Sequence, residues 1–244
     1  MNLSLESKII IAIGSKVFIF EIMNHQHKPQ SATKQDIDKY TEQVKNNEVL
    51  CNLPDCPCCK TASKFFKRHE LKERQFNIIE NLIVHIVIGL LIRWKCPGCN
   101  ITFTQYPWFA IPYKRYMLPT IIDLCWQYLE NALLTYRKLV EVWCPVEHKS
   151  GMILQHSTIH RWITTLGCYS VIIRESQKLI FKADPSLSIV KDLSNISVFG
   201  RKYKNSDRKT ILINCKKLIC LEKVYTAIFG VSIFSSLAAV CLFR

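Results

Sequence analysis

The sequence predicts an α+β protein, in which a small β zinc ribbon precedes an α-helical helix-turn-helix domain and a hydrophobic C-terminal helix. Two C-x-x-C pairs, amphipathic helical patterns after them and a long uncharged stretch near the C-terminus support this fold class. The expected parts are an N-terminal segment and linker (1–50), a zinc ribbon with a basic insert (51–106), a helix-turn-helix domain (117–183), a basic linker (184–223) and a hydrophobic C-terminal helix (224–243).

The composition indicates a folded, strongly basic protein. The chain has 244 residues, of which 49% are hydrophobic, which is enough for one large core or two small ones. Its formal net charge is +14, from 33 basic and 19 acidic residues. Such a charge favours an acidic polymer or an anionic membrane surface as partner, and nucleic acid is the commoner of the two. The alternative is that the excess of Lys and Arg only keeps the surface soluble.

The N-terminal segment contains two apolar runs, Ile9–Ile13 and Val17–Phe20, that predict strands or a short buried helix. Lys16 interrupts them and Glu6 precedes them, so they do not form the uninterrupted apolar core of a signal peptide. Gln35–Asn47 is expected to form a short helix. Twelve cysteines without a secretory signal indicate a reducing compartment. We therefore expect a cytoplasmic, nucleoid-associated protein.

The two C-x-x-C pairs predict a tetrahedral Zn²⁺ site, because each pair can turn two thiolates toward one point. The spacing between the pairs is 36 residues, longer than the usual spacing of about 15–20, so the insert is a loop or a longer hairpin. Two nearby cysteines leave the choice of the first two ligands open, and the alternative to a metal site is a set of reduced, buried cysteines. The expected ligands are Cys56, Cys59, Cys96 and Cys99, with Cys51 and Cys58 as competitors.

The residues around the second pair predict β-strands. Ile86–Trp94 is an apolar, β-branched run that enters it, and after it Ile101 and Phe103 alternate with threonines. The insert begins with a basic stretch between Lys60 and Arg74. Such a stretch can follow a phosphate backbone, and it can equally be a solvated loop.

The segment from Cys56 to Tyr116 carries the motifs R-W-K-C-P-G-C-N-I-T-F-T and Y-P-W-F-A-I-P-Y-K-R-Y. It resembles an uncharacterised bacterial family associated with insertion sequences, and the resemblance covers about residues 50–170. In that family a zinc ribbon precedes a helix-turn-helix, as in the DNA-binding regions of transposases. The resemblance implies binding to double-stranded DNA more firmly than it implies any reaction. The expected DNA contacts within these motifs are Arg93, Lys95, Lys114 and Arg115.

Three helices are expected after an extended, aromatic connector at Tyr106–Tyr116. Pro119 suits the first turn of one helix, and Thr135 is a suitable cap for a second from Tyr136 to about Trp143. A third helix has Ser157 as its expected N-cap.

The third helix has the pattern of a recognition helix. Its apolar residues recur at the spacing that packs one face into a core: Ile159, Trp162, Ile163 and Leu166. The other face carries side chains that can meet base edges and phosphates. The expected DNA contacts are Ser157, Thr158, His160, Arg161, Thr164 and Thr165. The alternative is an ordinary amphipathic surface helix.

The sequence shows no complete catalytic domain. The seven glycines are too scattered for a P-loop, a dinucleotide-binding turn or a nucleophile elbow. Only 78 residues follow Leu166, and their acidic residues are just Glu175, Asp184, Asp192, Asp207 and Glu222. We therefore expect a zinc-dependent, transposase-related DNA-binding protein that is not catalytic on its own. The alternative is a truncated or complete transposase with metal-dependent strand cleavage.

The C-terminal stretch Val224–Phe243 contains 20 residues without a charge, long enough to cross a hydrocarbon core of about 30 Å as a helix. A buried core or dimer helix and an end produced by truncation are the alternatives. A membrane-tethered DNA binder is therefore a second alternative function. The expected partners are double-stranded DNA, a second copy of the chain or a transposase subunit, and a membrane through residues 224–243.

Overall fold

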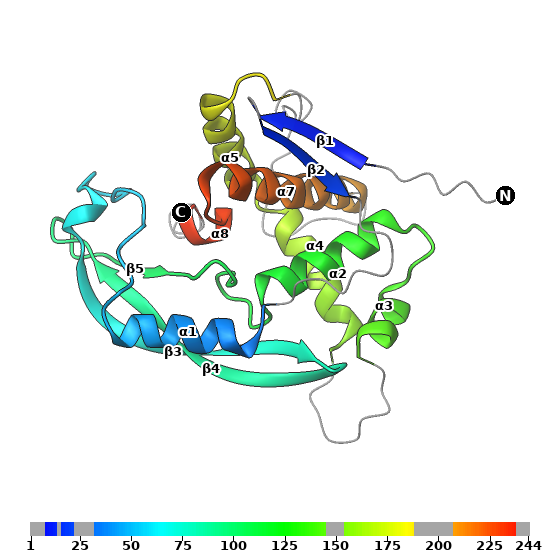
Figure 1. The fold of residues 1–244 in the computed structure, drawn as a ribbon, viewed down its shortest axis with the longest axis horizontal. Helices are drawn as coiled ribbons and strands as arrows, with labels where there is room; N and C mark the ends of the chain where they lie inside the picture. The colour runs from blue at the N-terminus through cyan, green and yellow to red at the C-terminus, as the bar shows by residue number, and fades with distance from the viewer. Residues whose placement is uncertain (1–7, 14–15, 22–31, 145–153, 188–206, 238–244) are drawn as a thin grey trace.

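The structure, a computed structural model, describes residues 8–13, 16–21, 32–144, 154–187 and 207–237. It has the expected α+β class: a three-stranded antiparallel sheet of order β3-β4-β5, a separate two-stranded sheet of order β1-β2, and a group of helices. Figure 1 shows the long β3–β4 hairpin along the bottom of the view, with α1 lying along it and the other helices above them.

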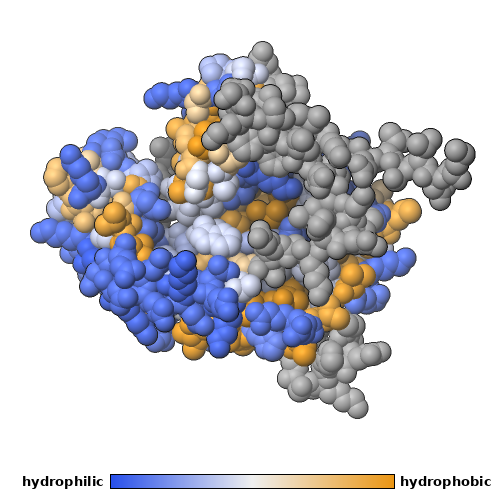
Figure 2. Space-filling view, in the orientation of Figure 1, coloured by the Kyte–Doolittle hydropathy of each residue, from blue (hydrophilic) through white to orange (hydrophobic). Residues whose placement is uncertain are grey.

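The N-terminal elements are β1 (Lys8–Ile13) and β2 (Lys16–Glu21), which pair antiparallel, and α1 (Lys34–Lys45). The apolar runs therefore form strands, which was one of the two predicted options. Helix α1 begins after Thr33, whose backbone N–H donates to the Asp36 carboxylate at 2.8 Å. This bond satisfies one of the backbone groups left open at a helix start. The outward side of α1 is hydrophilic and shows as the blue band in the lower part of Figure 2.

The insert between the cysteine pairs is a long hairpin. A short 3₁₀ turn (Ser63–Phe65) leads into β3 (Lys67–Glu80), which pairs with β4 (Ile83–Lys95) over thirteen residue pairs. The turn residues Asn81 and Leu82 have φ of 50° and 65°, as the twist of a two-residue hairpin requires. Strand β5 (Thr102–Gln105) pairs with the base of β4. The longer hairpin was the second of the two predicted forms of the insert.

Helix α1 packs directly on the hairpin because β4 has a glycine at the point of contact. A Cβ atom at Gly89 would lie 2.7 Å from Ile37 Cγ2 of α1 and 3.0 Å from the Phe76 ring. Ile37 and Phe76 are both buried. Any side chain at position 89 would therefore push the helix off the strand.

Two arginines of the basic insert turn inward and tie the hairpin to its neighbours. The Arg68 guanidinium donates to the carbonyl of Val44 in α1 at 2.6 Å. The Arg74 guanidinium donates to the carbonyls of Ile111 and Lys114 in the connector after β5. Burial lowers the pKa of Arg74. These two residues are therefore structural, whereas the lysines of the insert, Lys60, Lys64, Lys67 and Lys72, are exposed.

The six helices after β5 share one large core, and Val84 at the tip of the hairpin also packs in it. They are α2 (Leu118–Glu130), α3 (Tyr136–Trp143), α4 (His156–Gly167), α5 (Ser170–Ala183), α7 (Arg208–Phe229) and α8 (Ile233–Ser236). Pro119 lies in the first turn of α2, and the Thr135 hydroxyl accepts from the Lys138 N–H at 3.2 Å, as predicted. Gly167 permits close packing, since a Cβ there would lie 2.3 Å from the Ile211 carbonyl oxygen of α7.

The N-cap predicted for the third helix is wrong by two residues. Helix α4 begins at His156 with Gln155 as its N-cap, so Ser157 lies inside the first turn. The Ser157 carbonyl and hydroxyl instead accept from the Arg161 guanidinium at 3.3 and 3.5 Å. The chain enters the helix earlier, because the Thr158 N–H already donates to the Gln155 carbonyl at 2.8 Å, and Ser157 lies inside the first turn despite the preference of serine for the cap.

The predicted boundary between a basic linker and a C-terminal helix is also wrong. Helix α7 starts at Arg208, inside the expected linker, and ends at Phe229, where Gly230 has a φ of 70°. The short α8 follows, so residues 224–237 are not one helix, and residues 238–243 lie outside the described part of the chain. The reason is an apolar stripe within the basic segment: Ile211, Cys215, Leu218 and Ile219 are buried. Among the described residues, none of the helices is both long and apolar enough to cross a membrane.

A buried carboxylate joins α7 to α8. Glu222 is 5% exposed, and its carboxylate accepts from the Ile233 N–H at 2.8 Å and from the Thr226 hydroxyl at 3.4 Å. Burial raises the pKa of Glu222 to about 7 from the ordinary value of 4.5. The Glu222 carboxylate therefore accepts a backbone hydrogen bond at the start of α8. Its burial costs desolvation free energy, and this cost is larger for the ionised carboxylate than for the neutral acid.

This raised pKa predicts a specific dependence of stability on pH. Because the folded pKa lies above the unfolded one, the unfolded chain releases this proton first, and stability falls as pH rises from about 4.5 to about 7. The Glu222→Gln variant should lack this part of the fall, which amounts to about 3 kcal/mol. Urea unfolding of both proteins at pH 5 and pH 8 measures it. Asp123, whose pKa burial also raises to about 6, contributes equally to both proteins. Parallel pH profiles would contradict the assignment to Glu222.

Candidate metal centre

The two C-x-x-C pairs form two equivalent turns. In the first, the Cys56 N–H donates to the Thr61 carbonyl and the Lys60 N–H donates to the Cys56 carbonyl, both at 2.9 Å. In the second, Cys96 makes the same two bonds, with the Ile101 carbonyl and the Asn100 N–H, also at 2.9 Å. Lys60 and Asn100 each have a φ of 61°. The same local backbone therefore presents both pairs of sulfurs.

The four sulfurs of these turns meet at one point. The Sγ atoms of Cys56, Cys59, Cys96 and Cys99 all lie within 4.8 Å of one another. The Sγ atoms of Cys56 and Cys99 are 3.5 Å apart, those of Cys59 and Cys96 are 3.4 Å apart, and all four cysteines are free. A tetrahedral ion with metal–sulfur bonds of about 2.3 Å needs sulfurs about 3.8 Å apart. The four cysteines could therefore hold a metal ion, and zinc is compatible with the donor set.

The geometry resolves the choice of ligands in the first pair. Cys59 and Cys56 belong to the sulfur cluster, whereas Cys58 is exposed and outside it. Cys51 is half-buried and packs against the small core beside the cluster. The structure thus brings together the four cysteines that the spacing predicts.

The surroundings of the cluster are built to keep the two turns together. A Cβ at Gly98 would lie 2.5 Å from Thr61 Oγ1 and 3.0 Å from Cys59 Sγ, so only glycine fits between the turns. The Thr61 hydroxyl lies 3.0 Å from Cys59 Sγ, and hydrogen bonds from the Thr61 side chain and backbone lower the pKa of Cys59 to about 6. A thiolate is the form of cysteine that binds a metal, so this lowered pKa favours metal binding at Cys59. Beside the cluster, the Phe66 and Phe103 rings stack with their centroids 5.5 Å apart.

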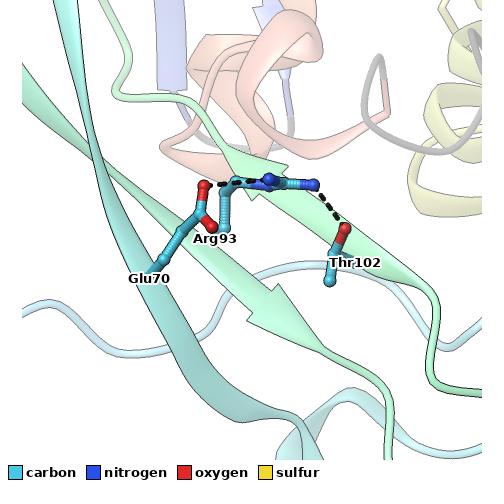
Figure 3. Close-up of polar contacts among 3 residues, drawn as sticks. All are labelled: Glu70, Arg93 and Thr102. Atoms are coloured by element: carbon cyan, nitrogen blue, oxygen red, sulfur yellow. Dashed lines mark hydrogen bonds and ion pairs between the residues drawn. The ribbon is translucent and has the colours of Figure 1, made fainter.

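Two of the predicted DNA contacts lie on the sheet beside the cluster. Arg93 of β4 forms an ion pair with Glu70 of β3 at 2.9 Å and donates to the Thr102 hydroxyl of β5 at 2.6 Å (Figure 3). The hydrogen bond from Arg93 lowers the pKa of Glu70. Arg93 therefore links three strands, and its charge is matched by a carboxylate. Lys95, two residues on, is half-buried.

The other predicted contacts lie on and around α4. The Thr164 and Thr165 hydroxyls donate to the His160 and Arg161 carbonyls at 2.8 and 2.7 Å. Thr165 also accepts from Lys114 Nζ at 3.0 Å. Ser157, Thr158 and His160 are half-buried, and Arg161 and Arg115 are exposed. The structure thus brings Lys114 to α4 but leaves Arg93 and Lys95 on another element.

Arg208, which the sequence patterns did not predict as a contact, adjoins this face of α4. Arg208, at the start of α7, donates to the Thr164 hydroxyl at 3.3 Å and to the Tyr136 hydroxyl of α3. Arg208 was assigned to the linker because it stands in a run of basic residues. The apolar spacing from Ile211 to Ile219 is the signal that could have placed it on a helix.

Comparisons with known proteins found no matching family model, no matching curated protein and no matching solved structure. The resemblance to an insertion-sequence family therefore remains a prediction. In the described residues, the four cysteines are the one group of three or more His, Cys, Asp or Glu side chains close enough to hold a metal ion.

Proposed function

We propose that this chain is a zinc-dependent DNA-binding protein of the mobile-element type, without catalytic activity of its own. The convergence of four free cysteine sulfurs within 4.8 Å carries the proposal. Thiolate ligands alone suit Zn²⁺ or iron–sulfur clusters, and two C-x-x-C turns closing on one point suit a mononuclear zinc ribbon. The net charge of +14 favours an acidic polymer such as DNA as the partner.

Bound zinc would act as a structural ion that holds the turn at Cys56–Cys59 against the turn at Cys96–Cys99. All four ligands come from the chain, so the site has no open position for a substrate. The base of the hairpin, including β5, would then be a rigid support. The exposed lysines of the insert would face the DNA backbone from it.

The packing of α2, α3 and α4 supports a helix-turn-helix in this proposal. These helices share a core that includes Leu139 of α3 and Ile159 and Trp162 of α4. The apolar side of α4 is buried, which fixes the helix and leaves its polar side outward. Twelve residues separate the end of α3 at Trp143 from the start of α4 at His156, more than the 3–4 residues of the usual turn.

The transposase alternative would need carboxylates gathered around metal ions. Among the acidic residues considered for that role, Glu222 supports α8, Glu175 pairs with Lys178 at 2.9 Å, and the Asp184 carboxylate accepts from Ser186. Each of these three carboxylates thus has a local structural role. Asp207 is the N-cap of α7, and Asp192 lies outside the described residues. These contacts favour the binding function over autonomous strand cleavage.

The proposed function predicts tight, salt-dependent binding to duplex DNA. With about four phosphate contacts, raising the salt concentration from 50 to 200 mM should weaken binding by about 100-fold, because each contact releases condensed counterions. Fluorescence anisotropy with labelled duplexes, including mobile-element end sequences, measures this. A protein that binds no duplex at 50 mM salt would contradict the proposal. Magnesium-dependent cutting of the same duplexes would instead support the transposase alternative.

A further inference from the structure

Three cations from three different segments converge on the polar side of α4. Lys114 comes from the connector after β5, Arg161 from α4 and Arg208 from the start of α7. The Thr165 hydroxyl accepts from Lys114 Nζ at 3.0 Å, and the Thr164 hydroxyl accepts from the Arg208 guanidinium at 3.3 Å. Arg161 precedes these threonines by three and four residues, so it lies on the same side of the helix.

These cations lack acidic partners in the described parts of the chain. Elsewhere in those parts, Arg93, Lys178 and Lys216 pair with carboxylates at 2.5–2.9 Å. Within the same residues, Lys114, Arg161 and Arg208 contact hydroxyl and carbonyl oxygens, and Arg208 also lies over the Tyr136 ring. Neutral partners orient a cation without cancelling its charge. Within the described residues, no carboxylate therefore pairs with any of the three cations.

Electrostatic effects link these groups in two pairs, which agrees with the hydrogen bonds to Thr164 and Thr165. Burial, followed by the charge of Arg161, lowers the pKa of Lys114. Burial, followed by the charge of Arg208, lowers the pKa of His160. Like charges held near each other are unfavourable, and an anion between them would reverse that effect.

The threonines already use their hydroxyl hydrogens within the helix. Thr164 and Thr165 each donate to a carbonyl four residues earlier and each accept from one of the cations. A hydroxyl has a single hydrogen to donate. Donation from these threonines to a base edge would therefore break an existing bond. Their geometry suits the positioning of Lys114 and Arg208.

We propose that Lys114, Arg161 and Arg208 form a phosphate-binding site that grips the phosphodiester backbone of DNA, while Thr164 and Thr165 position the cations. The site deepens the proposed function and rests on it. Two guanidinium groups and an ammonium group supply several N–H donors, which match the acceptor oxygens of a phosphate. Phosphate contacts of this kind fix the register of a protein on the duplex without reading its sequence. Base reading would then fall to the N-terminal part of α4.

Charge-removing variants test the site: Arg208→Gln, Arg161→Gln and Lys114→Met. Each should weaken binding about tenfold at 100 mM salt and reduce the slope of log affinity against log salt by about 0.9. The loss should be equal for duplexes of unrelated sequence. Thr164→Val, which keeps the shape but removes the hydroxyl, should also weaken binding without changing sequence preference.

Lys209→Gln is the matched control, because Lys209 follows Arg208 on the same helix and is exposed. It removes the same charge and should change affinity by less than about twofold if the effect is local. Circular dichroism and zinc content establish that each variant is folded. An equal loss in Lys209→Gln and Arg208→Gln would overturn the site, as would a change in sequence preference with an unchanged salt slope. If the wild type binds no duplex, the proposed function itself fails, and the site fails with it.

Discussion

Cys96→Ser is expected to abolish zinc binding and unfold the cysteine-bearing end of the three-stranded sheet. Cys96 is fully buried, and its sulfur lies 3.4 Å from Cys59 Sγ. A structural zinc ion contributes about 10–16 kcal/mol in isolated zinc-finger peptides, as much as the whole stability of many domains. The small core of Leu53, Phe66 and Phe103 could not replace that contribution. In metal analysis, the zinc content should fall from about one ion per chain to near zero, and the melting temperature should fall as well.

Cys58→Ser provides the matched control for that experiment. Cys58 is adjacent to Cys59 in sequence and equally exposed, but it lies outside the sulfur cluster. The same chemical change there should leave the zinc content and the melting temperature unchanged. Freshly purified wild-type protein without zinc, or a Cys96→Ser protein with its full zinc content, would refute the metal centre.

Trp162→Ala is expected to lower the free energy of unfolding by about 3–5 kcal/mol. Trp162 of α4 is 3% exposed, and its ring meets that of Tyr116 edge-on at a centroid distance of 5.0 Å. It belongs to the core shared by α2, α3, α4 and α7, so its loss would leave a cavity beneath the polar face of α4. Chemical denaturation followed by circular dichroism measures the change.

Trp108→Ala is the appropriate comparison, because Trp108 is 50% exposed. It contacts the Phe109 ring edge-on at 5.6 Å but lies outside the main core. We expect a loss of less than about 1 kcal/mol. Equal losses in the two variants would show that Trp162 does not anchor α4.

The features that could be predicted from the sequence are those set by local chemistry. The pairing of Cys56 with Cys59 and Cys96 with Cys99 follows from spacing alone, because each turn brings its own two sulfurs together. The strand before Cys96 follows from its β-branched residues, and the position of α3 follows from the cap at Thr135. Tertiary contacts were not needed for any of these.

The features that could not be predicted depend on contacts between distant segments. The sequence predicts solvent-exposed charges at Arg68 and Arg74. In the structure their guanidinium groups donate to carbonyl oxygens that are 24 to 40 residues away in the sequence. Arg208 reads as part of a linker, and its place beside α4 depends on the close approach of Gly167 to Ile211. The uncharged stretch from Val224 onward predicts a single helix. In the structure α7 ends before Gly230, and Glu222 accepts a hydrogen bond from the first residue of α8.

The length of the β3–β4 hairpin sets the distance between the two parts of the molecule that carry the proposed contacts. Its base holds the sulfur cluster, and Val84 at its tip belongs to the helical core. Thirteen residue pairs span at most about 44 Å at a strand rise of about 3.4 Å per residue. Because side chains alternate between faces, only the gain or loss of two pairs at a time would keep Phe76 and Gly89 toward α1. The length of the hairpin, and with it the distance between its base and the helical core, can therefore change only in increments of about 7 Å. This increment is close to the length of two base pairs of duplex DNA.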